Sequence, residues 1–258
     1  MNTSAPDEHV GVEILDDGIA VVTLKKPPAN TMDPDFLALF CDRLDELAAD
    51  KGATAVVLTA EGKAFCAGVD LKAVIEYGRP EQQAMVNGLN RMVQTVYGFR
   101  APVVAAVTGH AIAGGVILTL CCDYRVGPED IGLYGLAEVR AAVPFPFAAA
   151  EVARVELAPN AARKVILFAG NMGPGEALTN GIFDELQPLD RVRSRAIEHA
   201  RELAALPPGA YNTIKHQLRG PVLDRMAQVI ADGSDPALEH WITDETQTAA
   251  RALLEKRG

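Results

Sequence analysis

The sequence predicts an α/β fold in which a strand-rich core of repeated strand-strand-helix units is followed by a helical C-terminal region. Two continuous apolar runs, TAVVLTA and PVVAAVTG, have the length and composition of strands that are covered on both faces. A helical stretch at about residues 81–99 separates them and completes a strand-helix-strand crossover. From about residue 159 onward the pattern becomes helical and amphipathic.

The first unit is expected to be two strands followed by a helix. The runs VGVEIL and IAVVTL flank Asp16-Asp17-Gly18, an acidic and glycine-containing turn that is typical of a β-hairpin. Asp33 followed by Pro34 marks a helix start, because an aspartate side chain caps free amides and proline fits the first helical position. Apolar residues then recur at helical spacing, namely Phe36, Leu37, Phe40, Leu44 and Leu47.

Each buried strand is followed by a short segment of small residues. Residues 66–70, CAGVD, follow the first strand, and Ala113-Gly114-Gly115 follow the second and open an apolar helix. Small residues let a ligand carbonyl approach a backbone N–H closely. Two such amides can form an oxyanion hole, to which the positive end of a helix dipole would add. For either loop alone, a simple turn of the chain is the better explanation.

The C-terminal region is expected to hold three helices, at residues 191–206, 208–218 and 236–256, after a turn and a short extended piece in ALTNGIFDEL. We place a core domain at residues 1–195 and a helical oligomerisation region at 196–258, and expect them to fold as one unit because no long linker separates them. An apolar stripe exceeds what one compact domain has to cover and predicts self-association. It comprises Leu203, Leu206, Ile214, Leu218, Val222, Leu223 and Met226.

The composition excludes several classes of function. The chain has 258 residues, of which 49% are apolar, so it can bury a substantial core. A net charge of -10 disfavours nucleic acid and anionic membranes as partners, and a polyanionic cofactor would need a local basic spot. The polar start, MNTSAPDEHV, is unlike a signal peptide, and no apolar run reaches the roughly 18 residues of a membrane span. We therefore expect a soluble cytoplasmic protein.

Cysteine and histidine spacing predicts neither disulfides nor a metal site. The cysteines have no framework pattern, and buried reduced thiols are expected at Cys41, Cys66, Cys121 and Cys122. The histidines likewise lack metal-ligand spacing, so no metal is expected. His110 has no partner pattern for catalysis and is expected to form part of the pocket wall or to pack. Asp123 is expected to be a buried structural acid.

Three segments that occur in order resemble the signature of the crotonase (enoyl-CoA hydratase/isomerase) superfamily. They are KAFCAGVDLK, AAVTGHAIAGGVILTLCCDYRV and IGLYGLAEV. The similarity extends from VEILDDGIAVVTLKKPPANTMD to GEALTNGIFDEL and the last helix. The resemblance implies the crotonase (ClpP-like) spiral of strand-strand-helix units, an acyl-CoA thioester as substrate, no separate cofactor, and a homotrimer or a dimer of trimers.

Site residues follow from the resemblance by matching positions. The amides of Val69 and Gly114 would form the oxyanion hole. Lys72 matches the basic position that commonly meets the CoA phosphates, and a solvated lysine at a helix start is the alternative. The other candidates for binding CoA or substrate are Pro28, Ala29, Ala64, Ala67, Gly68, Asp70, Leu71, Gly115 and Ile117.

The carboxylates distinguish reactions within the superfamily. Hydratases of this family carry one glutamate after the second glycine loop, where this chain has Ile117, and another in a GxxE segment, which matches Glu138. Hydration commonly uses two acids, whereas moving a proton between C2 and C4 needs one base that returns the proton it took. The pattern is similar to that of the delta-3,delta-2-enoyl-CoA isomerases, although their usual asparagine before the glutamate is Ala137 here.

The sequence therefore predicts an enoyl-CoA isomerase in fatty acid degradation, with Glu138 as the catalytic base. One alternative is an enoyl-CoA hydratase or another acyl-CoA-processing enzyme, with Glu151 as a possible second acid near the pocket. The other alternative, from a different class, is an acyl-CoA-binding protein without catalytic activity.

Overall fold

Two sheets form the centre of the molecule in the computed structural model, which describes residues 8–50 and 52–255. The larger sheet contains β1 (Val10–Ile14), β2 (Ile19–Leu24), β3 (Ala55–Ala60), β5 (Val103–Ala106), β7 (Tyr124–Pro128) and β9 (Glu185–Gln187) in that spatial order. The smaller sheet contains β4 (Ala64–Cys66), β6 (His110–Ile112) and β8 (Tyr134–Gly135). β1 pairs with β2 antiparallel, and the remaining neighbours in both sheets are parallel.

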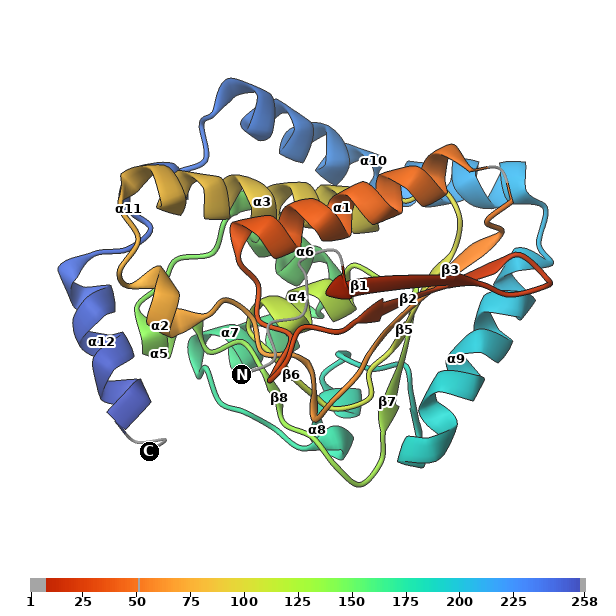
Figure 1. The fold of residues 1–258 in the computed structure, drawn as a ribbon, viewed down its shortest axis with the longest axis horizontal. Helices are drawn as coiled ribbons and strands as arrows, with labels where there is room; N and C mark the ends of the chain where they lie inside the picture. The colour runs from red at the N-terminus through yellow and green to blue at the C-terminus, as the bar shows by residue number, and fades with distance from the viewer. Residues whose placement is uncertain (1–7, 51, 256–258) are drawn as a thin grey trace.

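The helices cover the larger sheet on both faces (Figure 1). α9 packs against β3, β5 and β7, while α1 and α3 lie over the opposite face. β3 and β5 are buried along their whole length, as their unbroken apolar runs predict. The helices are α1 (Pro34–Ala49), α2 (Leu71–Val74), α3 (Arg79–Tyr97), α4 (Gly114–Leu120), α5 (Glu138–Ala141), α6 (Phe147–Glu156), α7 (Pro159–Leu167), α8 (Pro174–Thr179), α9 (Leu189–Ala204), α10 (Pro208–Asp232), α11 (Ala237–His240) and α12 (Asp244–Glu255).

The first unit has the predicted form of hairpin and helix. Gly18 adopts a φ of +81°, which glycine tolerates, and its N–H donates to the carbonyl of Leu15 at 2.9 Å to close the turn between β1 and β2. Asp33 caps α1, because its carboxylate accepts a hydrogen bond from the Phe36 N–H at 2.8 Å. The apolar face predicted for this helix is buried, which confirms its orientation toward the sheet.

The predicted spiral of strand-strand-helix units is confirmed, and it brings three loops together. Each turn of the spiral supplies one strand to each sheet, as in β3 and β4, β5 and β6, and β7 and β8. β4 leads into α2, β6 into α4, and β8 into α5. Since β4, β6 and β8 are parallel neighbours, the segments that follow them lie side by side at the same edge of the smaller sheet.

The C-terminal helices differ from the prediction at three places. The helix expected to end at residue 218 continues as α10 through Pro221 to Asp232, because Val222 and Met226 bury their side chains against the core. The last expected helix is divided into α11 and α12, since buried Trp241 turns the chain between them. The boundary expected at 195/196 falls inside α9, whose Ala196 and Ala200 are buried against the sheet, so α9 packs as part of the core.

Two further observations concern membrane-spanning helices and the cysteines. None of the helices in residues 8–50 and 52–255 combines the length and the apolar character that crossing a bilayer requires. The four cysteines are buried and free, as their spacing predicts.

Candidate active site

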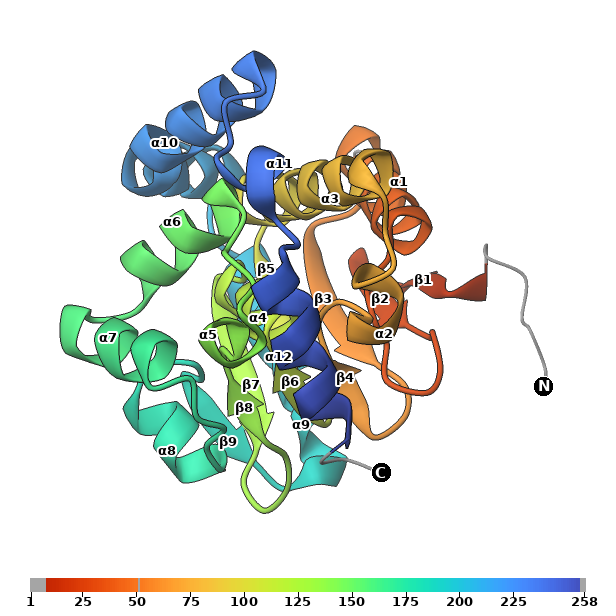
Figure 2. The same ribbon diagram turned by 90° about the vertical axis from the view of Figure 1, so that its left-hand side faces the viewer.

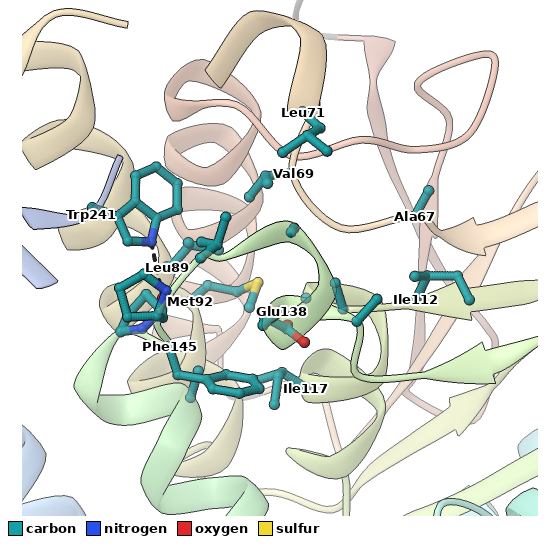
Figure 3. Close-up of a pocket in the computed structure, with 18 of the residues that line it drawn as sticks. Ala67, Val69, Leu71, Leu89, Met92, Ile112, Ile117, Glu138, Phe145 and Trp241 are labelled. Carbon is teal, nitrogen blue, oxygen red and sulfur yellow. Dashed lines mark hydrogen bonds between the residues drawn. The ribbon is translucent and has the colours of Figure 1, made fainter. Parts of the chain in front are cut away.

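An apolar cavity of about 130 Å³ lies where the loops after β4, β6 and β8 meet. Figure 3 shows Trp241 and Ala67 toward opposite ends of the drawn lining, with Glu138 between them. Side chains from α3, α12 and the segment before α6 complete the wall. The predicted site residues that line the cavity are Ala67, Val69, Leu71, Gly114, Ile117 and Glu138.

Glu138 is the only titratable side chain that lines the cavity within the described part of the chain. It is the first residue of α5, and its Oε2 atom is buried without a hydrogen-bond partner. Burial in apolar surroundings disfavours the ionised form and raises the pKa of Glu138 from 4.5 to about 7. A carboxyl group with this pKa can accept a proton and return it near neutral pH.

Two other side chains decide whether a second acid is present. Ile117 lines the cavity from α4 and is 1% exposed, so an apolar side chain occupies this wall. Glu151 lies outside the cavity lining and forms ion pairs with Arg154 at 2.7 Å and Arg225 at 3.2 Å. The hydrogen bond from Arg154 lowers the pKa of Glu151. Glu151, the possible second acid of the hydratase alternative, therefore does not face the cavity, and its carboxylate pairs with Arg154 of α6 and Arg225 of α10.

The N–H of Val69 points away from the segment at Met32, which forms a parallel bridge with the Val69 loop. The Met32 N–H donates to the Gly68 carbonyl at 2.9 Å, and the Asp70 N–H donates to the Met32 carbonyl at 3.4 Å. In a parallel bridge of this kind, the residue between the two bonded ones directs its own N–H to the opposite side. The Val69 amide is thus not used by the bridge, and Val69 lines the cavity.

The Gly114 amide is the second candidate donor. Gly114 is the first residue of α4, so no carbonyl of this helix can accept a hydrogen bond from its N–H. The two loops touch through their glycines: a Cβ on Gly68 would lie 2.9 Å from the Ala113 Cβ and 3.1 Å from the Gly114 nitrogen. Gly68 also has a φ of +76°. These contacts hold together the backbone segments that carry the two amides.

The start of α4 has little freedom. A Cβ on Gly115 would lie 2.1 Å from the Cys66 carbonyl oxygen, so only glycine fits between α4 and β4. Ala113 adopts φ 53° and ψ -121°, a conformation that is unfavourable for a residue with a side chain. Its methyl group faces Gly68. The chain therefore turns into α4 under strain, directly before Gly114, which lines the cavity.

The remaining predicted binding residues lie outside the cavity lining, next to the first loop. The Ala29 carbonyl accepts a hydrogen bond from the Ala67 N–H at 3.1 Å, which joins the Pro28-Ala29 segment to this loop. Asp70 caps α2 by accepting from the Lys72 N–H at 3.1 Å, and the Lys72 residue is exposed. Ala64, Gly68 and Gly115 are buried backbone positions.

Sequence reasoning missed an asparagine that organises this rim. Asn30 is 2% exposed, and its amide donates to the carbonyls of Glu61 at 3.0 Å and Ala64 at 2.8 Å. Its side-chain oxygen accepts from the Lys26 N–H at 2.7 Å. The asparagine in PPAN was the available signal, because a short amide side chain in a turn often hydrogen-bonds nearby backbone.

Most of the apolar wall was also missed. Its members come from distant parts of the chain, and their spacing on α3 is that of ordinary core residues. Trp241, the single tryptophan, was the strongest available signal. The missed lining residues include Leu89, Met92, Val93, Phe145, Trp241, Leu253 and Leu254.

Other candidate residues have structural contacts. His110 is exposed and lies outside the cavity lining, so the expectation of a pocket-wall or packing role is wrong; its Nδ1 accepts a hydrogen bond from the Leu133 N–H at 3.0 Å. Asp123 is a buried structural acid, as predicted, and pairs with Lys215 at 2.7 Å and Arg219 at 2.8 Å. Within residues 8–50 and 52–255, no three potential metal-ligating side chains gather at one point.

Known proteins are similar to this chain in sequence and fold over nearly its whole length. Mouse mitochondrial enoyl-CoA delta isomerase 1 is 30% identical over 243 residues, which cover 93% of this chain and 83% of the mouse protein. The crystal structure of human mitochondrial delta3-delta2-enoyl-CoA isomerase matches with a TM-score of 0.90 and 26% identity, over 96% of this chain and 98% of that one. The enoyl-CoA hydratase EchA3 of Mycobacterium ulcerans matches with a TM-score of 0.81 and 29% identity, over 90% and 98% of the two chains.

Relatives named for isomerisation and for hydration thus resemble this chain to a similar degree, so the names alone do not choose between the reactions. Both reactions belong to one family of enzymes, which act on acyl-CoA thioesters. The family model for enoyl-CoA hydratase/isomerase matches residues 15–258. With that match and the confirmed spiral fold, the chain belongs to the crotonase superfamily, as an enzyme of the enoyl-CoA hydratase/isomerase family.

Proposed function

We propose that this protein is an enoyl-CoA isomerase of fatty acid degradation, which shifts the double bond of a 3-enoyl-CoA to the 2-trans position. The observation that supports this function is the single titratable side chain, Glu138, on a cavity wall that is otherwise apolar in the described residues. Isomerisation only moves a proton from C2 to C4, and one base can perform both transfers. Hydration would need a water held against C3, and the Ile117 side chain offers it no hydrogen bond.

The reaction has two proton transfers. Glu138 as carboxylate takes a proton from C2, and the electron pair of the C–H bond spreads over the thioester carbonyl and the C3–C4 double bond as a dienolate. The same carboxyl group, now protonated, returns the proton to C4, and a double bond remains between C2 and C3. A pKa of about 7 makes both forms of Glu138 accessible near neutral pH.

The oxyanion hole stabilises the dienolate. Negative charge develops on the thioester oxygen, and the N–H groups of Val69 and Gly114 would donate to it. Because these amides are fixed before substrate binds, they need little reorganisation during the reaction, and removal of one such donor typically costs about 2.7–4 kcal/mol. The strained turn at Ala113 and the tight fit of Gly115 hold the second donor in place.

The rim next to the first loop would bind the CoA part of the substrate. Exposed Lys72 would meet the CoA phosphates, and the backbone of Pro28, Ala29 and Ala64 would contact the adenine and pantetheine groups. The apolar wall around Met92, Phe145 and Trp241 would hold the acyl chain. No separate cofactor takes part in this scheme, since the carboxyl group and two amides supply the chemistry.

The decisive experiment incubates the protein separately with a 3-enoyl-CoA and a 2-enoyl-CoA and identifies the products. The 3-enoyl-CoA should give the 2-trans-enoyl-CoA, and 3-hydroxyacyl-CoA should form slowly from either substrate. A ratio of hydration to isomerisation above one would overturn the proposed function. Binding of the CoA ester without any turnover would favour the non-catalytic alternative.

The proposal includes a homotrimer or a dimer of trimers. Three apolar side chains of the predicted stripe project into solvent from α10 and the preceding loop, with exposures of 46% for Leu206, 62% for Ile214 and 78% for Leu218. Val222 and Met226 of the same stripe are buried within the chain. Light scattering should give a mass of three or six chains, and a monomer at micromolar concentration would contradict the assembly.

A further inference from the structure

Two single-turn helices carry residues of the candidate site. α2 (Leu71–Val74) begins two residues after Val69 and has Ile75 as its C-cap, and α5 (Glu138–Ala141) begins with Glu138 and has Ala142 as its C-cap. Each helix has four residues. A helix of one turn contributes few hydrogen bonds of its own, so its position depends on contacts with the rest of the fold. The separation between the oxyanion amides and the base is therefore set partly from outside these helices.

Adjacent residues of α12 hold the ends of both helices. The Thr246 hydroxyl donates to the Ala142 carbonyl at 2.6 Å, and the Gln247 side-chain amide donates to the Ile75 carbonyl at 3.3 Å. α12 packs against both α5 and α2. Figure 2 shows α12 running between these two helices across the front of the molecule. One helix thus bridges the two sides of the candidate site.

The Thr246 hydroxyl is itself held in a defined direction. Thr246 is fully buried, and its Oγ1 accepts from the Thr243 N–H at 3.1 Å while its own N–H donates to the Thr243 Oγ1 at 3.3 Å. This reciprocal cap at the start of α12 leaves the hydroxyl hydrogen for the Ala142 carbonyl. The hydroxyl therefore connects the α12 cap directly to the end of α5.

The turn after Glu138 is fixed at neighbouring residues. The Val143 N–H donates back to the Glu138 carbonyl at 3.0 Å. The carbonyl before Val143 accepts from Thr246, and the carbonyl after it, that of Pro144, accepts from Trp241 Nε1 at 3.2 Å. The C-terminal segment thus holds the peptide groups on both sides of the residue that closes the Glu138 turn.

We propose that Thr246 and Gln247 are positioning residues, which together set the distance between the Glu138 carboxyl group and the Val69 amide. They touch neither the reacting atoms nor the CoA ester in this scheme, and they act through the backbone ends of α5 and α2. The inference rests on the proposed function and deepens it. A displacement of the base by about 1 Å can cost roughly a hundredfold in rate. Loss of the hydrogen bonds from Thr246 or Gln247 should therefore lower kcat measurably, even if the two helices move little.

The first experiment compares substitutions on α12. Thr246→Val removes the hydroxyl, and Thr246→Ser keeps it. Thr248→Val makes the same change at an exposed residue whose hydroxyl donates to the Asp244 carbonyl of its own helix. We expect Thr246→Val to lower kcat about ten- to hundredfold with little change in KM. Thr246→Ser and Thr248→Val should keep kcat within about threefold. Equal kcat in Thr246→Val and Thr248→Val would overturn the proposal.

Gln247→Leu provides a second variant in case Thr246→Val does not fold. Gln247 is half-buried, so this change should disturb the fold less, while it still releases the Ile75 carbonyl. We expect kcat to fall about three- to tenfold, again without a matching rise in KM. Unchanged kcat in folded Gln247→Leu would remove Gln247 from the proposal.

The second experiment does not need turnover. The pKa of Glu138 in the folded protein is read from the pH above which the stability difference between wild type and Glu138→Gln stops growing, and the comparison is repeated in the Thr246→Val background. No other titratable side chain lines the cavity in the described residues, and Arg140, Asp244 and Glu245 nearby on α5 and α12 are exposed. We expect the released turn to admit water and lower the pKa of Glu138 by about one unit.

The two experiments separate the two proposals. If wild type fails to isomerise 3-enoyl-CoA but Thr246→Val still lowers the pKa of Glu138, the proposed function is wrong and the positioning role remains. If Thr246→Val only lowers overall stability, and both the kcat of the folded protein and the pKa of Glu138 stay unchanged, the positioning role is refuted.

Discussion

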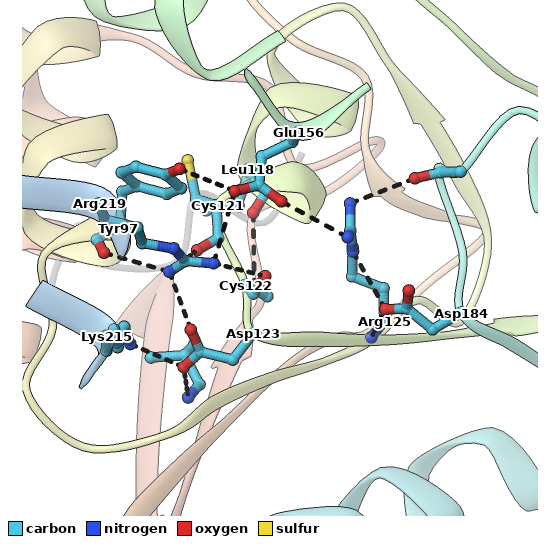
Figure 4. Close-up of polar contacts among 12 residues, drawn as sticks. Tyr97, Leu118, Cys121, Cys122, Asp123, Arg125, Glu156, Asp184, Lys215 and Arg219 are labelled. Carbon is cyan, nitrogen blue, oxygen red and sulfur yellow. Dashed lines mark hydrogen bonds and ion pairs between the residues drawn. The ribbon is translucent and has the colours of Figure 1, made fainter. Parts of the chain in front are cut away.

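The two ends of α4 lie in opposite surroundings. At its start, Gly114 borders an apolar cavity lined by Glu138, whose Oε2 atom is buried without a hydrogen-bond partner. Just beyond its end, the carbonyls of Cys121 and Cys122 accept hydrogen bonds from the buried guanidinium of Arg219 at 3.3 and 3.4 Å (Figure 4). The same short helix therefore separates a region without charge pairs from a buried ionic network.

Every carboxylate in the network has partners. Asp123 binds Lys215 at 2.7 Å and Arg219 at 2.8 Å, and Glu156 accepts from the Tyr97 hydroxyl at 2.7 Å. The guanidinium of Arg219 also stacks 4.0 Å from the centre of the Tyr97 ring. The Oε2 atom of Glu138 is also buried but has no hydrogen-bond partner. Burial without a charged partner thus raises the pKa of the Glu138 carboxyl group, whereas the paired buried charges link α3, α6 and α10.

The largest expected effect is on the rate of Glu138→Gln. The isomerase rate should fall at least about a hundredfold, because a general base typically contributes 10²–10⁴-fold, while affinity for the CoA ester stays similar. Glu156→Gln makes the same change in the ionic network and should lose stability but keep its rate per folded molecule within about threefold. Steady-state kinetics check both variants, and near-wild-type turnover by Glu138→Gln would refute its role as base.

The second largest effect is expected on stability, when the charge of Arg219 at the centre of the network is removed. Arg219→Met leaves Asp123 and Glu156 with fewer partners in a buried site, and the free energy of unfolding should fall by about 3 kcal/mol or more. Arg191→Met is the matched control at an exposed pair with Glu198 and should change stability by less than about 0.5 kcal/mol. Urea unfolding measures both. Similar losses in the two variants would contradict the contrast between buried and exposed charges.

The pH dependence of stability tests the cavity end of α4, where Glu138 is buried without a charged partner. Because folding raises the pKa of Glu138 from 4.5 to about 7, its protonated form favours the folded state, and this contribution is lost as the pH rises through 7. At pH 9, Glu138→Gln should therefore be more stable than wild type by up to about 3 kcal/mol. At pH 4 the two proteins should differ little. A constant difference from pH 4 to pH 9 would show that the carboxyl group is solvated or paired.

The smallest expected effect is a change in reaction preference. Ile117→Glu places a second carboxyl group on the cavity wall, where it can orient water, and the ratio of hydration to isomerisation should rise about tenfold. The added carboxyl group also needs a water or a polar partner, because burial without one costs several kcal/mol. Ile117→Gln is the control of similar size without a strong base. An equal ratio in both variants would rule out the added carboxylate as the cause.

Much of the fold could be predicted from local patterns. The hairpin at Gly18, the cap at Asp33 and the buried strands β3 and β5 depend on neighbouring residues or on unbroken apolar runs, which the sequence displays directly. The lengths of the C-terminal helices could not be predicted in this way. α10 continues through Pro221 because distant side chains bury Val222 and Met226, and this tertiary contact outweighs the local preference of proline.

Residues of the candidate site could be predicted only where they lie within a short sequence motif that has a known role. Glu138, Val69 and Gly114 lie in short segments whose order resembles a known signature, and the structure brings them together on one cavity. Trp241 and Thr246 reach the site from more than ninety residues away, through hydrogen bonds to the carbonyls of Pro144 and Ala142. Backbone carbonyls are present in every residue, so the sequence holds no sign of which carbonyl such a side chain will bind.

The strained turn at Ala113 sets stability and activity against each other. Glycine accepts φ 53° and ψ -121° readily, so Ala113→Gly would relieve a cost on the order of 1–3 kcal/mol, part of which returns as greater freedom of the unfolded chain. It would also remove the methyl group that packs on Gly68 beside the Gly114 amide. Selection for heat resistance alone would favour the glycine, whereas selection for turnover would retain the alanine. Laboratory evolution of this enzyme therefore has to score both properties at this position.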